Sequence, residues 1–89
     1  MTWAFEVSPE FERDYRKTCH RNAGFRKAVD TKVLQILEDP TRFKPLRAPM
    51  QGLRRVHVGG SYVIVFEPDL TRNSVRFLRL AHHDEAYGI

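Results

Sequence analysis

The feature that most constrains the fold is a run of five consecutive apolar residues, from Tyr62 to Phe66, placed soon after two adjacent glycines. A strand with one face in water alternates apolar and polar residues, whereas a strand covered on both faces is apolar throughout. The run therefore predicts a central strand. Gly59 and Gly60 can adopt the positive φ angles of a tight turn, so we expect residues 53–58 and 61–67 to form a β-hairpin.

Local signals outside the hairpin predict the remaining elements. Apolar side chains alternate over residues 2–7, which favours a strand, and Ser8 followed by Pro9 is typical of a helix start. A second helix is expected over residues 25–38, a loop over 41–52, a turn over 68–73 and a last strand over 74–81. This order, β-α-α-β-β-β, predicts the α+β class: an antiparallel β-sheet with an N-terminal α-helical hairpin packed on one face.

Length and composition predict a single domain over residues 1–89. A chain of 89 residues builds one core, and one cysteine excludes an internal disulfide. No apolar run reaches membrane-spanning length, and the amino end lacks the pattern of a signal peptide. We therefore expect a soluble cytoplasmic protein.

The net charge of +4 lies entirely in the second half of the chain. Residues 1–41 hold seven Lys/Arg and seven Asp/Glu, whereas residues 42–89 hold eight and four. No carboxylate occurs between Pro40 and Phe66, where Arg42, Lys44 and Arg47 lie. Such a segment attracts phosphates and suits contact with a polyanion.

Strand parity predicts where the candidate site lies. Arg54, Val56 and Val58 share one face of their strand and Arg55 and His57 the other. The valine face suits the helices, so Arg55 and His57 are expected on a face open to solvent. If the last strand is regular, its odd positions share one face; these are Val75, Phe77, Arg79, Ala81 and His83.

Several stretches together resemble the RelE/ParE toxin superfamily of toxin–antitoxin modules, most of all its YafQ type. The resemblance covers essentially the whole chain. It is carried by Lys44-Pro-Leu46, Gly52-Leu-Arg-Arg-Val-His57-Val, Tyr62-Val-Ile-Val-Phe66, Val75-Arg-Phe-Leu-Arg79 and His83-Asp-Glu-Ala-Tyr87-Gly.

The resemblance implies a ribosome-dependent mRNA endoribonuclease that cuts by attack of a 2′-hydroxyl on the adjacent phosphate and needs no metal or other cofactor. By position in the family pattern it implies catalytic roles for His57, His83, Tyr87, Arg55 and Lys44. Contacts to RNA are expected from Arg47, Arg54, Tyr62 and Arg79.

Two positions depart from that pattern. Ser61 stands where YafQ-type toxins have aspartate, and Val63 stands where RelE has arginine. The first departure leaves the general base open, and the second removes an expected phosphate contact. Alternatives are therefore a ParE-like toxin that binds DNA gyrase without nuclease activity, or a degenerate member that binds only RNA or an antitoxin.

Partners follow from the same resemblance and from the basic charge. We expect an acidic antitoxin that covers the basic groove, together with the ribosomal A site and mRNA, and no membrane. His82 and His83 stand beside Asp84, but adjacent residues do not converge easily on one ion, so no metal site is expected.

Overall fold

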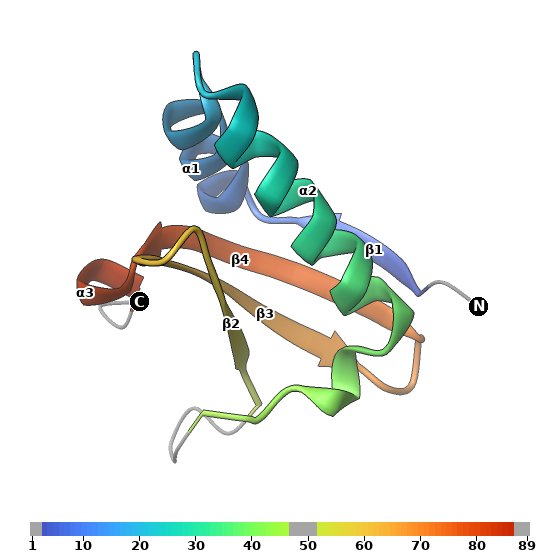
Figure 1. Cartoon of the computed structure of the whole chain (residues 1–89). Coiled ribbons are helices and arrows are strands. Elements are labelled where there is room, and N and C mark those ends of the chain that lie inside the picture. Colours follow the sequence, from blue (N-terminus) through green and yellow to red (C-terminus); the bar gives the residue numbers. More distant parts are fainter. Residues whose placement is uncertain (1–2, 47–51, 87–89) are drawn as a thin grey trace.

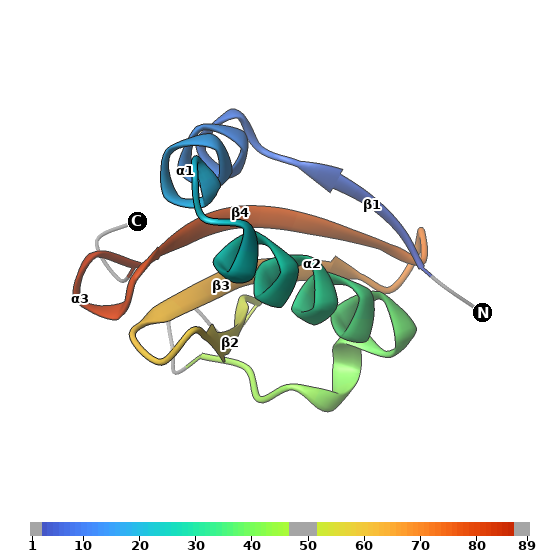
Figure 2. The ribbon, with the colours of Figure 1, turned by 45° about the horizontal axis from the view of Figure 1, so that its top comes forward.

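The computed structural model describes residues 3–46 and 52–86, so the predicted site residues Arg47 and Tyr87 lie outside the described residues. Two helices cover one face of a four-stranded sheet, as Figures 1 and 2 show. The strands are β1 (Ala4–Val7), β2 (Arg54–Val58), β3 (Tyr62–Asp69) and β4 (Ser74–His82). The helices are α1 (Pro9–Cys19), α2 (Ala23–Glu38) and the short α3 (His83–Ala86), and the 3₁₀ turn η1 spans Pro40–Arg42. The predicted α+β class and element order are confirmed.

Capping side chains fix where the two long helices begin. The Ser8 hydroxyl accepts a hydrogen bond from the Phe11 N–H at 2.9 Å and donates one to the Leu78 carbonyl at 2.9 Å. Helix α1 is therefore capped and tied to β4 by one side chain. Asn22 accepts from the Phe25 N–H at 3.0 Å, so α2 begins at Ala23, two residues before the predicted start.

The sheet is mixed, with strand order β1-β4-β3-β2. Strands β2, β3 and β4 pair antiparallel, as the hairpin pattern predicted, whereas β1 pairs parallel with β4. The purely antiparallel sheet of the sequence analysis is corrected at this one edge. Strand β1 precedes β4 by the whole helical hairpin and the β2–β3 hairpin, and a connection of that length permits either direction.

The main core lies between the helices and the sheet. Phe66, Phe77, Ile64 and Ile36 are fully buried there. Every residue from Val63 to Phe66 has 0% exposure, which confirms β3 as a strand covered on both faces. No helix in the described part of the chain is long and apolar enough to cross a bilayer.

A β-bulge changes the parity of β4. Val65 pairs with Arg79 and Phe66 pairs with Phe77, so Leu78 has no partner on β3. Because of this extra residue, each later residue of β4 lies on the face opposite to the one it would have in a regular strand. Val75 and Phe77 therefore face the helices, while Arg79 and Ala81 do not, and the predicted single face for these positions is wrong.

Candidate functional site

The bulge brings Arg79 onto the same sheet face as Arg55 and His57. The register pairs Val65 with both Arg55 and Arg79, and pairs Val63 with both His57 and Ala81. Directly paired residues project from the same face, so each set of three forms a row across the sheet. Two strand spacings separate the Cα atoms of Arg55 and Arg79 by about 10 Å.

This face is not fully open, which corrects the sequence-based expectation. Val63 and Val65 have 0% exposure and Ala81 has 4%, and they form a second apolar cluster with Leu53 and Leu78. Arg55 and His57 are exposed beside them. Val63 thus lies in an apolar environment, in which a charged side chain would be costly.

The hairpin turn holds His83 near the end of this face. The His83 backbone N–H donates to the Ser61 carbonyl at 2.9 Å, which fixes the start of α3 against the β2–β3 turn. The His57 position is two residues before Gly59 in the same turn. The His83 side chain is half exposed, and its Nε2 lies 3.0 Å from Asp84 Oδ1. The backbones of two histidines from distant parts of the chain therefore lie next to one turn.

Arg79 and Arg54 already have partners within the protein. The Arg79 Nε donates to Asp14 at 2.7 Å, and both side chains are mostly buried. Arg54 lies on the helix side and donates to the carbonyls of Phe43 and Thr41, which ties η1 to β2. The structure thus gives both arginines bonds that hold elements together, and it separates Arg54 from Arg55 and His57.

The remaining predicted residues are divided between the two faces. Tyr62 lies on the helix side, with its ring 5.1 Å from that of Phe25, so the structure does not bring it together with His57. Lys44 is exposed and precedes Pro45, which forms an isolated bridge with Arg54. The backbone of Lys44 is therefore beside the start of β2, close to Arg55.

Three side chains at the β4–α3 junction converge more closely than we expected for adjacent residues. One ligand atom from each of His82, His83 and Asp84 lies within 4.8 Å of the others. The junction ends the strand and starts a helix, which turns neighbouring side chains toward one another. Their exposure, 38% and 51% for the histidines and 74% for Asp84, is equally that of solvated polar groups.

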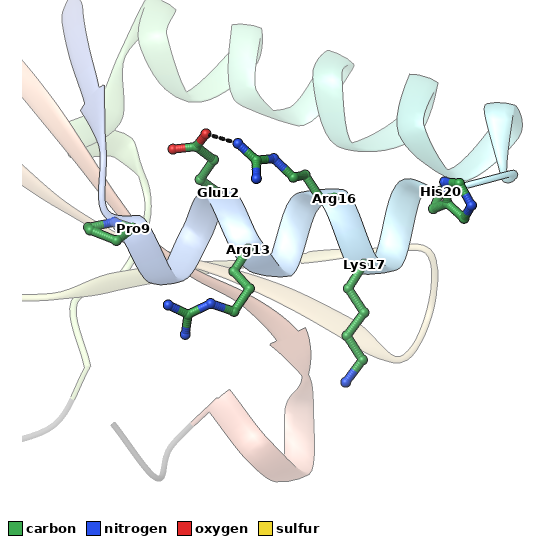
Figure 3. A pocket seen from close by; sticks show the side chains of 6 residues that line it. All are labelled: Pro9, Glu12, Arg13, Arg16, Lys17 and His20. Carbon is green, nitrogen blue, oxygen red and sulfur yellow. Dashed lines mark hydrogen bonds and ion pairs between the residues drawn. The ribbon is translucent and has the colours of Figure 1, made fainter.

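Sequence reasoning missed a basic face on α1, because it counted the first half of the chain as neutral. Arg13, Arg16, Lys17 and His20 line a groove of about 610 Å³ with Glu12 and Pro9, shown in Figure 3. Their spacing of three and four residues was the available signal, since such positions share one side of a helix.

Comparison with known proteins places the chain in a family. The family described as ParE toxin of type II toxin-antitoxin system, parDE, matches residues 5–87. The putative toxin RelE4 of Methanocaldococcus jannaschii is 32% identical over 85 residues, which cover 96% of this chain and 90% of that protein.

Solved structures share the fold at low sequence identity. The toxin of the E. coli RelBE toxin–antitoxin complex aligns with a TM-score of 0.74 at 16% identity, covering 90% of this chain and 95% of that chain. The E. coli DinJ–YafQ complex gives a TM-score of 0.74 at 18% identity, covering 99% and 100%. The chain therefore belongs to the RelE/ParE superfamily of type II toxin–antitoxin toxins.

Proposed function

We propose that this toxin is a metal-independent endoribonuclease that cuts mRNA in the ribosomal A site and so inhibits translation in the cytoplasm. One observation carries the proposal. Arg55 and His57 are exposed on one sheet face, and the backbone of His83, at the start of α3, is bonded to the turn that follows β2. A phosphodiester at this end of the sheet would have a cation and two imidazoles within reach.

The proposed reaction needs a base, an acid and a cation. One imidazole takes the proton from the 2′-hydroxyl, and the 2′-oxygen forms a bond to phosphorus while the bond from phosphorus to the 5′-oxygen breaks. The other imidazole donates a proton to that 5′-oxygen, which leaves a 2′,3′-cyclic phosphate and a 5′-hydroxyl. Arg55 neutralises the charge that develops on the phosphate oxygens, and Lys44 adds a second cation.

Two further roles follow from the family resemblance. We assign Tyr87 to stacking on a nucleotide and Arg47 to the RNA backbone. The inward bonds of Arg54 and Arg79 favour structural roles for them, and the contact between Tyr62 and Phe25 does the same for that ring.

A partner is supported by the solved relatives, several of which are complexes of a toxin with its antitoxin. We propose that this chain also binds an antitoxin, that the antitoxin is acidic, and that it covers the basic half of the sheet. The product of the adjacent open reading frame is the candidate to test.

The nuclease proposal is tested by inducing the toxin and mapping the ends of cellular messengers. Cuts at a fixed position within codons are expected from the wild type, and their loss is expected in His83→Ala and His57→Ala. Arg55→Gln should weaken cutting, while Arg72→Gln, an exposed arginine in the turn between β3 and β4, serves as the charge-matched control. Growth arrest by the wild type with intact messengers would overturn the proposal.

A second function is favoured by the family match itself, which is to ParE toxins. A ParE-like toxin would bind DNA gyrase and would not need an imidazole pair. The same induction experiment separates the two: DNA damage that persists in His83→Ala supports the gyrase toxin. A third outcome, full growth with no cutting of RNA, would indicate a degenerate member that binds only RNA or its antitoxin.

A further inference from the structure

We infer that the basic face of α1 is a second RNA-binding surface, which holds phosphates of the RNA backbone and extends the proposed active site across the helix layer. This inference rests on the proposed function for the identity of the polyanion. It concerns Arg13, Lys17 and His20, in the half of the chain whose summed charge is zero.

The acids of α1 do not neutralise this face. Asp14 turns toward β4, where it accepts hydrogen bonds from Arg79 and from the Leu80 backbone N–H. Glu12 is paired with Arg16, its neighbour one turn along. Within residues 3–46 and 52–86, no ion pair is formed by Arg13 or Lys17. Neither of these two cations of the groove is therefore held in an ion pair by an acid of the described residues.

A third acid, Glu10, is exposed at the amino end of α1. It is one turn away from Arg13, whose charge it partly offsets, but seven residues before Lys17, which is roughly 10 Å along the helix axis. At that distance its charge is largely screened at physiological ionic strength. The carboxyl end of the groove, formed by Lys17 and His20, thus keeps its positive charge.

The direction of the side chains connects this face to the candidate site. Arg13 and Lys17 point from α1 toward the side on which α3 lies, whereas Arg16 points toward Glu12 (Figure 3). The bond from Leu80 to Asp14 holds α1 against β4 beside Arg13. His83 follows Leu80 by three residues, about 10 Å along a strand. An RNA strand that passes His83 can therefore continue onto α1.

An RNA backbone fits the groove better than a lipid surface does. The groove is lined by cations and polar groups spaced along a helix, and it lacks the exposed apolar residues with which a membrane-bound helix enters a bilayer. Phosphate contacts of this kind add affinity without reading sequence. The strand could be the messenger beyond the cleavage site or ribosomal RNA, and both present the same phosphates.

The test measures binding separately from cleavage. The probe is a short single-stranded RNA with 2′-O-methyl groups, which cannot undergo 2′-hydroxyl attack, and its affinity is measured over a range of salt concentrations. Each lost phosphate contact lowers the slope of log K against log salt by about 0.7 for a single strand. The double substitution Arg13→Gln with Lys17→Gln should therefore lower the slope by about 1.4.

Two matched variants act as controls. Lys27→Gln with Arg72→Gln removes the same charge from exposed positions on α2 and on the β3–β4 turn, and it should leave the slope unchanged. Arg13→Lys with Lys17→Arg keeps the charge and should keep the slope.

A parallel experiment uses ribosomes washed free of messenger. If the Arg13→Gln/Lys17→Gln variant loses binding only to these ribosomes, the strand on α1 is ribosomal RNA. If it loses binding only to the free RNA, the strand is the messenger.

The inference is overturned if the Arg13→Gln/Lys17→Gln variant keeps the wild-type slope of log K against log salt with both the free RNA and the ribosomes. It is also overturned if the Lys27/Arg72 variant shows an equal fall in that slope. A loss of binding to anionic vesicles without a loss of binding to RNA also overturns it, in favour of a lipid surface. If the wild type cuts no RNA, but the Arg13/Lys17 variant still shows the predicted fall in slope, the RNA-binding surface stands and only the nuclease proposal fails.

Discussion

The Asp14 carboxylate lies where α1 meets β4, and it accepts hydrogen bonds from the Arg79 guanidinium at 2.7 Å and from the Leu80 N–H at 3.0 Å. Strand β1 pairs with β4 only as far as Phe77, so the Leu80 N–H lies beyond the end of that ladder. A side chain from a helix therefore completes the hydrogen bonding of the sheet edge, and it does so beside the bulge that directs Arg79.

Asp14→Ala leaves a backbone N–H and a mostly buried guanidinium without this acceptor. The free energy of unfolding should fall by about 1–3 kcal/mol, because an unsatisfied buried donor loses its water without compensation. Asp14→Asn keeps an acceptor for Leu80 and should lose less. Glu12→Ala, which breaks an exposed pair on the same helix, is the control and should cost no more than about 0.5 kcal/mol in urea unfolding.

Tyr15 links the two helices through its hydroxyl, which donates to Asp30 at 2.8 Å. Burial, followed by the hydrogen bond to Asp30 and the charge of Asp30, raises the pKa of Tyr15 from 10.0 to about 12. The folded state thus holds the phenolic proton more tightly than the unfolded state does. The stability that this provides is fully present below pH 10 and is lost as the pH rises toward about 12.

Tyr15→Phe should remove this part of the pH dependence. The difference in unfolding free energy between wild type and variant is expected to shrink between pH 10 and about pH 12. Urea unfolding at several alkaline pH values measures it, and phenolate absorbance reports the titration itself. A constant difference across that range would contradict the prediction.

At the scale of elements, the β2–β3 hairpin is the element that the sequence predicts most directly and that carries Arg55 and His57. Its turn carries Gly59 and Gly60 with φ angles of +61° and +83°. The turn packs against α2 on one side and accepts the His83 N–H through Ser61 on the other. Small changes in the turn are therefore transmitted to both the core and α3.

Gly59→Ala and Gly60→Ala separate backbone strain from packing. A Cβ at Gly59 would lie 2.5 Å from the Phe25 ring, whereas a Cβ at Gly60 meets nothing within 4 Å. Gly60→Ala should cost about 1–2 kcal/mol from its left-handed backbone alone. Gly59→Ala should cost clearly more, because the Phe25 ring must also move. Equal losses in thermal or urea unfolding would show that the ring yields freely.

At the scale of the whole molecule, the distribution of charge decides which partners approach and from where. The sheet half carries all of the net charge of +4, and the folded chain adds the basic face of α1 near α3. A partner of opposite charge is attracted before contact, so its association rate depends on salt.

An acidic antitoxin should therefore bind with a rate constant that falls steeply as ionic strength rises, while its dissociation rate changes little. Stopped-flow mixing of the toxin with the product of the adjacent reading frame measures both rates. Arg55→Gln should slow association. Arg72→Gln should slow it less, because Arg72 lies in the β3–β4 turn, away from the sheet face that carries Arg55 and His57. A salt-independent association rate would contradict electrostatic steering.

The sequence by itself determined the elements and most of their ends. Apolar periodicity, Ser8 with Pro9, and the glycine pair predicted β1, α1, α2 and the hairpin, because these signals act between residues a few positions apart. The same local alternation placed Arg55 and His57 together on the face away from the helices. The family resemblance correctly indicated the RelE/ParE superfamily.

Only the tertiary structure decided the composition of the candidate site. The bulge at Leu78, the parallel pairing of β1 and the bond from Asp14 to Arg79 join residues that are far apart in the chain. No local pattern records such contacts, since a strand slipped by one residue keeps the same sequence and exchanges its two faces. For this reason the sequence could supply candidate side chains, but three-dimensional pairing selected which of them share a face.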